Sequence, residues 1–392
     1  MKIITFGHIP VSVGGLQSSG LANVIYRLAY HGAKQDGVEM YLAATDVFVP
    51  KLEKDQLTIL GWTKSLLIKH ALVHPFATMR IIFNTIRCKM AFSPLVSVPG
   101  LLIKGIFLDY AIKKTNPDVI HLHGAHSVMY YHVLPQNVKL VVTLHGNVGC
   151  DNNLPNVNTH AEVERTLCSS ERIDRLCTIS STIPKILQNM YGGIKARTQV
   201  ILNAYDNKAF HYIDAVPHNK ITLCTIASFS KLKGQERVLD ALRSSGCDYR
   251  YQCIGHISDS DRERLSESYK DIEFEWLGIK KPEEIREILA GCDYMVLPSS
   301  TEGFGLVYLE AIACGVPVII PKHLPLALER DILNEKNAIR IEDSSSDAIK
   351  AVLPSLASQT WNRKDVSESV ISYTWDNIAK EYNELYKSLL AE

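Results

Sequence analysis

Short apolar runs of strand length alternate with amphipathic stretches of helical spacing along almost the whole chain. In the first half, the runs lie at residues 3–6, 39–45, 119–124, 140–146, 176–180 and 199–203. Near residue 205 the pattern begins again, with runs at residues 221–227, 251–254, 273–277, 294–297 and 316–320. Continuous apolar runs separated by helices are typical of buried parallel strands in βαβ units. The pattern predicts an α/β fold with two doubly wound, Rossmann-like domains that face each other across a cleft.

The restart of the pattern sets the expected domain boundary. We expect a first domain over residues 1–204 and a second over residues 205–374, each long enough for its own core. The final segment carries Tyr382, Leu385, Tyr386 and Leu389 at helical spacing. We therefore expect residues 375–392 to form a helix that crosses back and joins the first domain.

Composition and charge exclude several classes of protein. Hydrophobic residues make up 46% of the chain and charged residues 21%, which is the profile of a soluble globular protein. Lys and Arg together number 42, as do Asp and Glu, so the net charge gives no reason to expect nucleic-acid binding. Residues 1–6 are typical of a first strand rather than a signal peptide. No window reaches the roughly 18 apolar residues of a membrane span, so we expect a cytoplasmic protein, free or peripheral at the inner face of the cell membrane.

The nine cysteines are scattered and form no Cys-x-x-Cys pair. Several of them, such as Cys224 and Cys253, lie inside apolar runs, where a free thiol behaves as a small hydrophobic side chain. This usage favours a reducing compartment over a framework of disulfides.

Residues 56–114 are expected to form a basic insert in the first domain. Residues 56–108 contain no Asp or Glu, although the acidic content of the whole chain predicts about five or six. The basic residues of this span are Lys64, Lys69, Arg80, Arg87, Lys89 and Lys104. They are mixed with large apolar and aromatic residues, a combination that suits the surface of an anionic membrane. The alternative is a helical insertion that packs on its own domain, with its basic side chains solvated.

Histidines gather at the ends of two predicted strands. His121 and His123 alternate within a buried strand, and no cysteine or acid completes a set of metal ligands with them and His126. We therefore interpret His121 and His123 as buried, hydrogen-bonded histidines rather than metal ligands. His145 is different, because it lies where a strand ends and the loop Gly146-Asn147 begins, the usual place for ligand contacts in a doubly wound sheet.

A glycine-rich stretch after the strand at residues 294–297 carries the most specific chemistry. The loop Glu302-Gly303-Phe304-Gly305 leads into a helix that begins near Leu306. At such a junction the unpaired backbone N–H groups and the helix dipole favour the same anion. A diphosphate is therefore expected on the N–H groups of Phe304, Gly305 and Leu306.

Two glutamates and a lysine complete the candidate site. If Glu302 and Glu310 were both helical, they would lie roughly 12 Å apart along the axis, farther than the about 5 to 9.5 Å between the carboxylates of glycosidases. The spacing suits two hydroxyl-bearing rings at either end of a diphosphate better than a hydrolytic acid and base. Lys233, which precedes another helix, is expected to neutralise the diphosphate without a metal.

A second glycine loop follows the first strand. Gly14 and Gly15 lie at the carboxyl end of that strand, but the pattern is not Gly-x-Gly-x-x-Gly, so a dinucleotide fingerprint is not supported. Gly15 is a candidate ligand contact, and the alternative is a loop that needs glycine only for its turn.

The sequence EGFGLVYLEAIACGVPV at residues 302–318 resembles the signature of the family-four retaining glycosyltransferases, which have the GT-B fold. Further similarities lie at the Gly14-Gly15 loop, at NPDVIH (116–121), at TLHG (143–146), at Lys233-Gly234 and at Gly278. The resemblance covers the chain apart from the basic insert.

The resemblance implies a role for each matching residue of the second domain. Glu302 would bind hydroxyls of the donor sugar, with the amides of Phe304 and Gly305 nearby. Glu310 would bind the ribose, and Lys233 the diphosphate.

The resemblance also implies the remaining contacts and the reaction. Gly15 would lie against the phosphates, His145 beside the reacting sugar and Ile279 beside the base. The family transfers a sugar with retention of configuration and without a metal. The leaving phosphate is thought to accept the proton of the acceptor in a front-face attack.

Two positions depart from the family pattern. The family commonly has an arginine five residues before the lysine, where this chain has Ser228, so Lys231 or the backbone would have to compensate. The family's Asn-Gly-Val-Asp turn is Asn-Ala-Tyr-Asp here, at residues 203–206.

The resemblance leaves the substrates open. A UDP-sugar donor is favoured, with GDP- and ADP-sugars as alternatives, and no cofactor is expected. The acceptor is expected to be a glycan or a lipid-linked molecule in the synthesis of a cell-surface polysaccharide (O-antigen, lipopolysaccharide or capsule). Other functions that remain open are a nucleotide-sugar epimerase, a phosphorylase, which would need a pyridoxal-bearing lysine, and a non-catalytic sugar-binding subunit.

Overall fold

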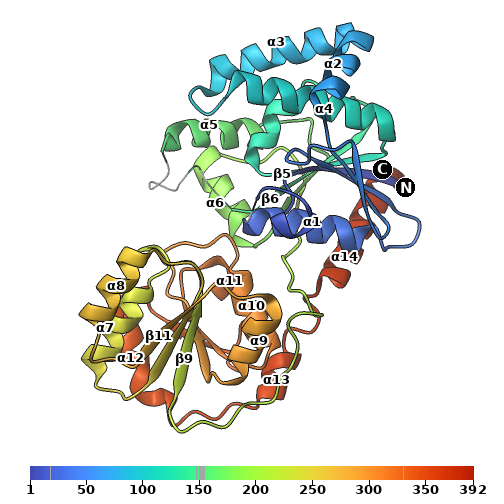
Figure 1. Cartoon of the computed structure of the whole chain (residues 1–392). Coiled ribbons are helices and arrows are strands. Elements are labelled where there is room, and N and C mark those ends of the chain that lie inside the picture. The colour runs from blue at the N-terminus through green and yellow to red at the C-terminus, as the bar shows by residue number, and fades with distance from the viewer. Residues whose placement is uncertain (18, 147–148, 150–154, 330) are drawn as a thin grey trace. The chain divides into compact units, whose positions relative to one another are not determined.

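A computed structural model describes the chain except for residues 18, 147–148, 150–154 and 330. The fold divides into two compact units, drawn in Figure 1. Unit 1 consists of Met1–Asn203 with Trp375–Glu392, and unit 2 consists of Ala204–Thr374. The division falls one residue before the expected position. The cleft expected between the units stays a prediction.

Within the described residues of unit 1, eight strands form one sheet in the order β3-β4-β2-β1-β5-β6-β7-β8. The strands are β1 (Lys2–Gly7), β2 (Glu39–Ala44), β3 (Lys51–Lys54), β4 (Leu57–Leu60), β5 (Val119–His123), β6 (Lys139–Leu144), β7 (Arg175–Thr178) and β8 (Thr198–Val200). Every pair is parallel except β3 with β4. The central strand β1 lies between β2 and β5, so the chain leaves it in one direction and later returns on the other side.

The helices of unit 1 lie around this sheet. They are α1 (Gly20–Gly32), α2 (Lys64–Val73), α3 (Pro75–Phe92), α4 (Val98–Thr115), α5 (Val157–Cys168), α6 (Thr182–Tyr191) and α14 (Trp375–Ala391), with short 3-10 turns η1 (Val11–Val13) and η2 (Ala125–Tyr130). Helix α4 contacts the strands β1 and β2, and α2 and α3 pack on α4 (Figure 1). The basic insert is thus largely helical and packs on its own unit, as the alternative interpretation expected, while its contact with a membrane stays a prediction.

The C-terminal helix α14 belongs to unit 1, where it packs against α1. Its aromatic side chains reach the centre of the sheet. The hydroxyl of Tyr386 lies 2.7 Å from His121 Nδ1, and the hydroxyl of Tyr382 lies 3.0 Å from Thr143 Oγ1. Thr143 Oγ1 also lies 2.7 Å from His121 Nε2. His121 is therefore buried with both ring nitrogens hydrogen-bonded, as predicted.

In unit 2 the described residues form a parallel six-stranded sheet in the order β11-β10-β9-β12-β13-β14. The strands are β9 (Thr222–Ile226), β10 (Arg250–Ile254), β11 (Phe274–Gly278), β12 (Tyr294–Val296), β13 (Val318–Pro321) and β14 (Ala338–Ile341). Here the central strand β9 lies between β10 and β12. Each unit is therefore a doubly wound Rossmann-like domain, and the predicted α/β class is confirmed.

Helices cover the sheet of unit 2 and enclose its core. They are α7 (Gln235–Ser245), α8 (Asp259–Ser268), α9 (Pro282–Ala290), α10 (Leu306–Ala313), α11 (Pro325–Leu328), α12 (Ser346–Leu356) and α13 (Arg363–Glu368). Leu239 of α7 and Leu353 of α12 are fully buried in one apolar cluster with Tyr251 of β10. Local signals set several ends: Pro282 starts α9, and Ser345 caps α12 by accepting the N–H of Ala348.

The structure corrects some of the expected elements. The expected insert begins with a strand, β4, which pairs with β2 and with β3, and the sequence analysis missed both β3 and β4. The edge strand β14 was also missed. These strands are four residues long, too short for a clear alternating pattern.

Two further expectations concern cysteines and membrane helices. The eight described cysteines are all free, and Cys150 lies outside the described residues. No single helix in the described part of the chain combines the length and apolar composition of a membrane span. Helices α2 and α3 meet that test only as a pair, and they are bent by 110° at the break between them.

The bond between Tyr386 and His121 gives a testable contribution to stability. Tyr386→Phe removes the partner of a buried ring nitrogen, so we expect the free energy of unfolding to fall by about 1–3 kcal/mol. Denaturant unfolding of the purified protein measures the change. Tyr212→Phe is the control, because that hydroxyl bonds Asp214 at the surface and its loss should cost less than about 0.5 kcal/mol. Equal effects of the two substitutions would contradict the proposed contribution.

Candidate donor and acceptor sites

Two of the predicted residues of unit 2, Lys233 and Glu302, lie in loops that emerge side by side. The loop with Lys233 follows β9, and the loop with Glu302 follows β12, its parallel neighbour. Because the carboxyl ends of parallel strands meet at one edge of the sheet, residues 69 positions apart come together. The backbone N–H of Ser300 also donates to the carbonyl of Leu232, at 2.8 Å, and ties the two loops together.

Lys233 and Glu302 are in direct contact. The distance from Lys233 Nζ to Glu302 Oε1 is 2.6 Å, and the side chains are 33% and 12% exposed. The hydroxyl of Ser299 donates to the same carboxylate oxygen at 2.7 Å. An ammonium group has three N–H donors, so Lys233 keeps two for another acceptor. Within the described residues, Glu302 Oε2 accepts no hydrogen bond.

An arginine that the sequence analysis missed braces both loops. The guanidinium of Arg237, on the first turn of α7, donates to the carbonyl of Lys231 at 2.7 Å and to that of Pro298 at 2.6 Å. Burial lowers the pKa of Arg237 from its usual value. Its position on the first turn of the helix that follows Lys233 was the available signal.

The helix α10 begins where the sequence predicts an anion site. Its N-cap is Gly305, with φ at +91°, and a Cβ there would lie 2.7 Å from the ring of Tyr308. Only glycine fits this position without strain. In the described hydrogen-bond network, no acceptor takes the N–H of Phe304, Gly305 or Leu306. Those N–H groups at the positive end of the helix are suited to bind an anion.

The remaining predicted residues of unit 2 lie on segments that also leave the carboxyl edge of its sheet. Glu302 lies before the helix and Glu310 within it, so the helical estimate of their separation does not apply to this pair. Gly303 lies in the loop beside Glu302. Ile279 follows β11 directly after Gly278, whose φ is +76°, and its side chain is 75% exposed. An apolar side chain so exposed at the carboxyl edge is available to a flat ligand such as a base.

Ser228 occupies the position of the family's arginine. Ser228 and Lys231 are both exposed. Lys231 contributes only its backbone carbonyl to the described network, through the bond from Arg237. That Lys231 replaces the second cation of the family stays a prediction.

In unit 1, the Gly15 loop is held by an aspartate that the sequence analysis did not single out. Asp46 accepts the backbone N–H of Ile9 at 3.1 Å and that of Leu16 at 2.9 Å. Gly14 takes the left-handed turn, with φ at +102°. Gly15 needs glycine for another reason, since a Cβ there would lie 2.0 Å from the carbonyl oxygen of Ile9. Close approach of the backbone, rather than the turn, requires glycine at this position.

His145 forms a pair with His123 at the ends of β6 and β5. His145 Nε2 lies 2.9 Å from His123 Nδ1, and His123 Nε2 lies 2.9 Å from Thr5 Oγ1. His145 Nδ1 has no hydrogen-bond partner among the described groups. The pair fixes the imidazole of His145 and leaves one ring nitrogen for a ligand.

Burial strongly affects these histidines. It lowers the pKa of His145 to about 4 and that of His121 to about 3, with the neighbouring His145 adding to the second effect. The pKa of His123 is also lowered well below its usual value, mainly by burial. All three are therefore neutral near pH 7, and His145 is suited to a hydrogen bond rather than to a charge interaction.

A cavity of about 290 Å³ lies beside this pair. Its wall includes His8 after β1, His123 at the end of β5, His126 after β5, and Lys104 of α4. Burial and the charge of Lys104 lower the pKa of His8, although Asp46 opposes the shift. The cavity lies between the ends of β1 and β5, where the strand order of unit 1 reverses, which is the expected place for a ligand. Sequence analysis assigned Lys104 only to the basic insert.

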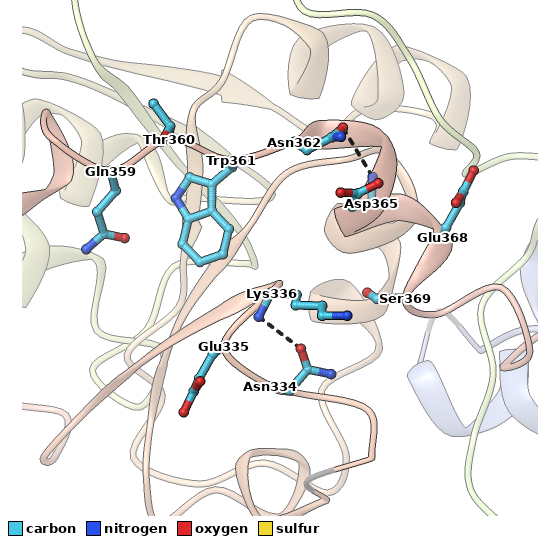
Figure 2. A pocket seen from close by; sticks show the side chains of 10 residues that line it. All are labelled: Asn334, Glu335, Lys336, Gln359, Thr360, Trp361, Asn362, Asp365, Glu368 and Ser369. Atoms are coloured by element: carbon cyan, nitrogen blue, oxygen red, sulfur yellow. Dashed lines mark hydrogen bonds between the residues drawn. The ribbon is translucent and has the colours of Figure 1, made fainter.

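A different hollow of unit 2, of about 740 Å³, contains none of the predicted site residues (Figure 2). Asn334 and Lys336 on its wall precede β14, so this part of the hollow is at the amino end of the sheet. Lys233 and Glu302 follow their strands and lie at the opposite, carboxyl edge. Ligands of doubly wound sheets bind at the carboxyl edge, which favours the site at Lys233.

Comparison with known proteins agrees with this geometry. Residues 18–208 match the sequence model of Glycosyltransferase Family 4, and residues 206–371 match that of Glycosyl transferases group 1. The two matches cover nearly the whole chain, including the insert. The fold and the paired loops define a GT-B glycosyltransferase, and the chain belongs to the family 4 glycosyltransferases. The predicted recognition is confirmed: this is an enzyme of a retaining, metal-independent family that takes its sugar from a nucleotide-sugar.

Individual relatives are distant. D-inositol 3-phosphate glycosyltransferase of Corynebacterium urealyticum is 26% identical over 305 residues, which are 69% of this chain and 72% of the relative. Sucrose-phosphate synthase of Thermosynechococcus elongatus superposes with a TM-score of 0.75 over 100% of both chains, at 18% identity. HepE of Anabaena, solved in complex with UDP, superposes with a TM-score of 0.67 at 15% identity, over 99% of this chain and 100% of that one. At these identities the two structures support the fold alone.

The buried histidines predict a loss of stability in acid. Their pKa values are lower in the folded state, so the unfolded state binds more protons between pH 6.5 and about 4. The free energy of unfolding should therefore be greatest above pH 6.5 and fall as the pH decreases toward 4. At about 1.4 kcal/mol per pKa unit, the protonation of His145 alone should lower the free energy of unfolding by about 3 kcal/mol over this range. Denaturant unfolding across this range measures the slope, and His145→Asn should flatten it. An equally steep slope in that variant would refute the assignment.

Proposed function

We propose that this glycosyltransferase moves a hexose from a UDP-sugar to a glycan or a lipid-linked acceptor, in the synthesis of a cell-surface polysaccharide. It would work in the cytoplasm, at the inner face of the cell membrane. The UDP bound by HepE of Anabaena supports this choice of nucleotide, with GDP and ADP as alternatives. The basic insert supports an acceptor at a membrane.

The observation that carries the proposal is the contact between Lys233 and Glu302 at the start of α10. Lys233 has two N–H donors left for a phosphate oxygen, and the N–H groups of Phe304 to Leu306 lie in the adjoining loop. Glu302 Oε2 is left for a sugar hydroxyl. One cluster can therefore bind the diphosphate and the sugar that is attached to it.

The same cluster supplies what transfer requires. Negative charge grows on the leaving diphosphate as the glycosidic bond breaks, and Lys233 with the helix N-terminus stabilises that charge. In the retaining reaction the leaving phosphate would accept the proton of the attacking hydroxyl, so no protein base is needed. His145, neutral and fixed by His123, would then orient the sugar through Nδ1 rather than transfer a proton.

Glu302→Gln and Lys233→Met are expected to lower kcat by about 10²–10³ each, since each removes a charge that acts on the transition state. Before that assay, a thermal-shift screen of nucleotide-sugars identifies the donor, because a ligand that binds the folded state raises its stability. Transfer is then measured with the donor that gives the largest shift.

Lys220→Met is the matched control. Lys220 pairs with Asp248 and Glu273 ahead of β9, at the amino edge of the same sheet. Its replacement should leave transfer unchanged within about twofold. Full activity of the Glu302 or Lys233 variant would refute the proposed site. Conversion of the donor without any acceptor would favour an epimerase.

Transfer is also expected to survive EDTA. Lys233 and the backbone N–H groups at α10 can supply the positive charge that other enzymes take from a divalent cation. The rate with excess EDTA should equal the rate with added Mg²⁺ or Mn²⁺. A strict requirement for either metal would contradict this account of the diphosphate site.

A further inference from the structure

Helix α3 carries a row of large apolar side chains on its outer side. These residues, here called the apolar stripe, are Phe76, Met79, Phe83, Ile86 and Met90. They are separated by three or four positions, so they lie along one face of the helix. All five are exposed, Phe76 to 91% and Met90 to 82%. Side chains of this kind rarely form a continuous exposed row on a free surface.

The stripe is not needed for the core, because the opposite face of α3 is already packed. That face is formed by Ile81, Asn84, Thr85, Cys88 and Phe92, all buried. The side-chain amide of Asn84 donates to the carbonyl of Met129 at 2.7 Å and fixes this orientation. Figure 1 shows α3 outside α4. Ile68, Leu72 and Val73 of α2 add further exposed apolar side chains.

Basic side chains border this apolar surface. Arg80 and Arg87 each follow a stripe residue by one position, which is roughly 100° around the helix. Lys64 and Lys69 are exposed on α2. Residues 56–108 contain no acid that could neutralise them. Apolar side chains with a basic border suit the interface of an anionic lipid bilayer.

We propose that the outer face of α2 and α3 docks on an anionic lipid surface, with the apolar stripe inserted between the headgroups. A second copy of the chain fits less well, because a two-fold contact would bring the basic borders of both copies together. An anionic bilayer has an apolar interior for the stripe and negatively charged headgroups for the basic border.

The docking surface is linked to the cavity of unit 1 through α4. This helix supports α2 and α3, and it carries Lys104 to the wall of the cavity beside His8 and His126. A lipid-linked acceptor could keep its tail in the bilayer while its charged headgroup binds near Lys104. This last step rests on the proposed function, whereas the docking itself does not.

Co-sedimentation of the full chain with vesicles tests the docking. One set of vesicles is pure phosphatidylcholine, and the other is an equal mixture of phosphatidylcholine and phosphatidylglycerol. We expect binding to the mixed vesicles only, weakened by salt. Phe76→Ser with Met90→Ser should weaken that binding by about tenfold or more. Lys69→Gln with Arg87→Gln should weaken it roughly fivefold for each charge removed.

The matched control is Val216→Ser with Ile371→Ser, which removes two exposed apolar side chains from unit 2. It should bind the mixed vesicles like the unchanged protein, and thermal unfolding checks that each variant is folded. Equal binding to both kinds of vesicle, or none, would overturn the proposal. So would a stripe variant that changes a dimer into a monomer without changing vesicle binding. Vesicle binding without sugar transfer would support docking and refute the proposed function.

Discussion

The hydrogen bond between Lys233 and Glu302 depends on the order of the strands in unit 2. The chain leaves β9 toward β10 on one side and returns to β12 on the other, so β9 and β12 are parallel neighbours without a direct connection. Loops that follow such a pair diverge to different helices and leave a crevice at the carboxyl edge of the sheet. Lys233 and Glu302 meet there, and Arg237 fixes both loops to each other. The order of the strands therefore brings these two side chains together, and their chemistry then determines what the site can bind.

Unit 1 repeats the arrangement with different residues. Its central strand β1 lies between β2 and β5. The loop after β1 carries Gly15, and β5 ends at His123. The cavity lies at this reversal of strand order. Here the lining combines Lys104 with histidines that are largely neutral, in place of a lysine paired with a carboxylate. Each unit thus has a hollow or crevice where its strand order reverses, but the side chains there differ in charge and polarity.

The sequence was enough to predict the fold class and to single out Lys233, Glu302 and Gly305 as candidates, because both leave local patterns. The roles of these residues in binding stay predictions. Apolar runs reveal parallel strands, and a glycine before a helix reveals an anion site. The contact of Lys233 with Glu302 leaves no such pattern, because the spacing of apolar residues does not indicate the order of the strands in a sheet. Helix α3 shows a related limit. Its more apolar face is the outer one, and a rule that buries the apolar face would orient it wrongly. The buried face is stabilised by a tertiary bond, from Asn84 to Met129, that only the folded chain reveals.

Several polar groups at these sites have no partner among the described residues. They include Glu302 Oε2, His145 Nδ1 and the N–H groups at the start of α10. His145 Nδ1 is buried. A buried polar group without a partner costs about 1–3 kcal/mol, so folds seldom keep one without a reason. In unit 2 one acceptor, Glu302 Oε2, is followed within one short stretch by three N–H donors, at Phe304, Gly305 and Leu306. This order suits a hydroxyl-bearing ring next to a phosphate. In unit 1 the free nitrogen belongs to a histidine that burial keeps neutral, which suits a hydroxyl better than a phosphate. The groups without a partner therefore differ in kind between the two units: backbone donors and a carboxylate oxygen in unit 2, and a neutral imidazole nitrogen in unit 1.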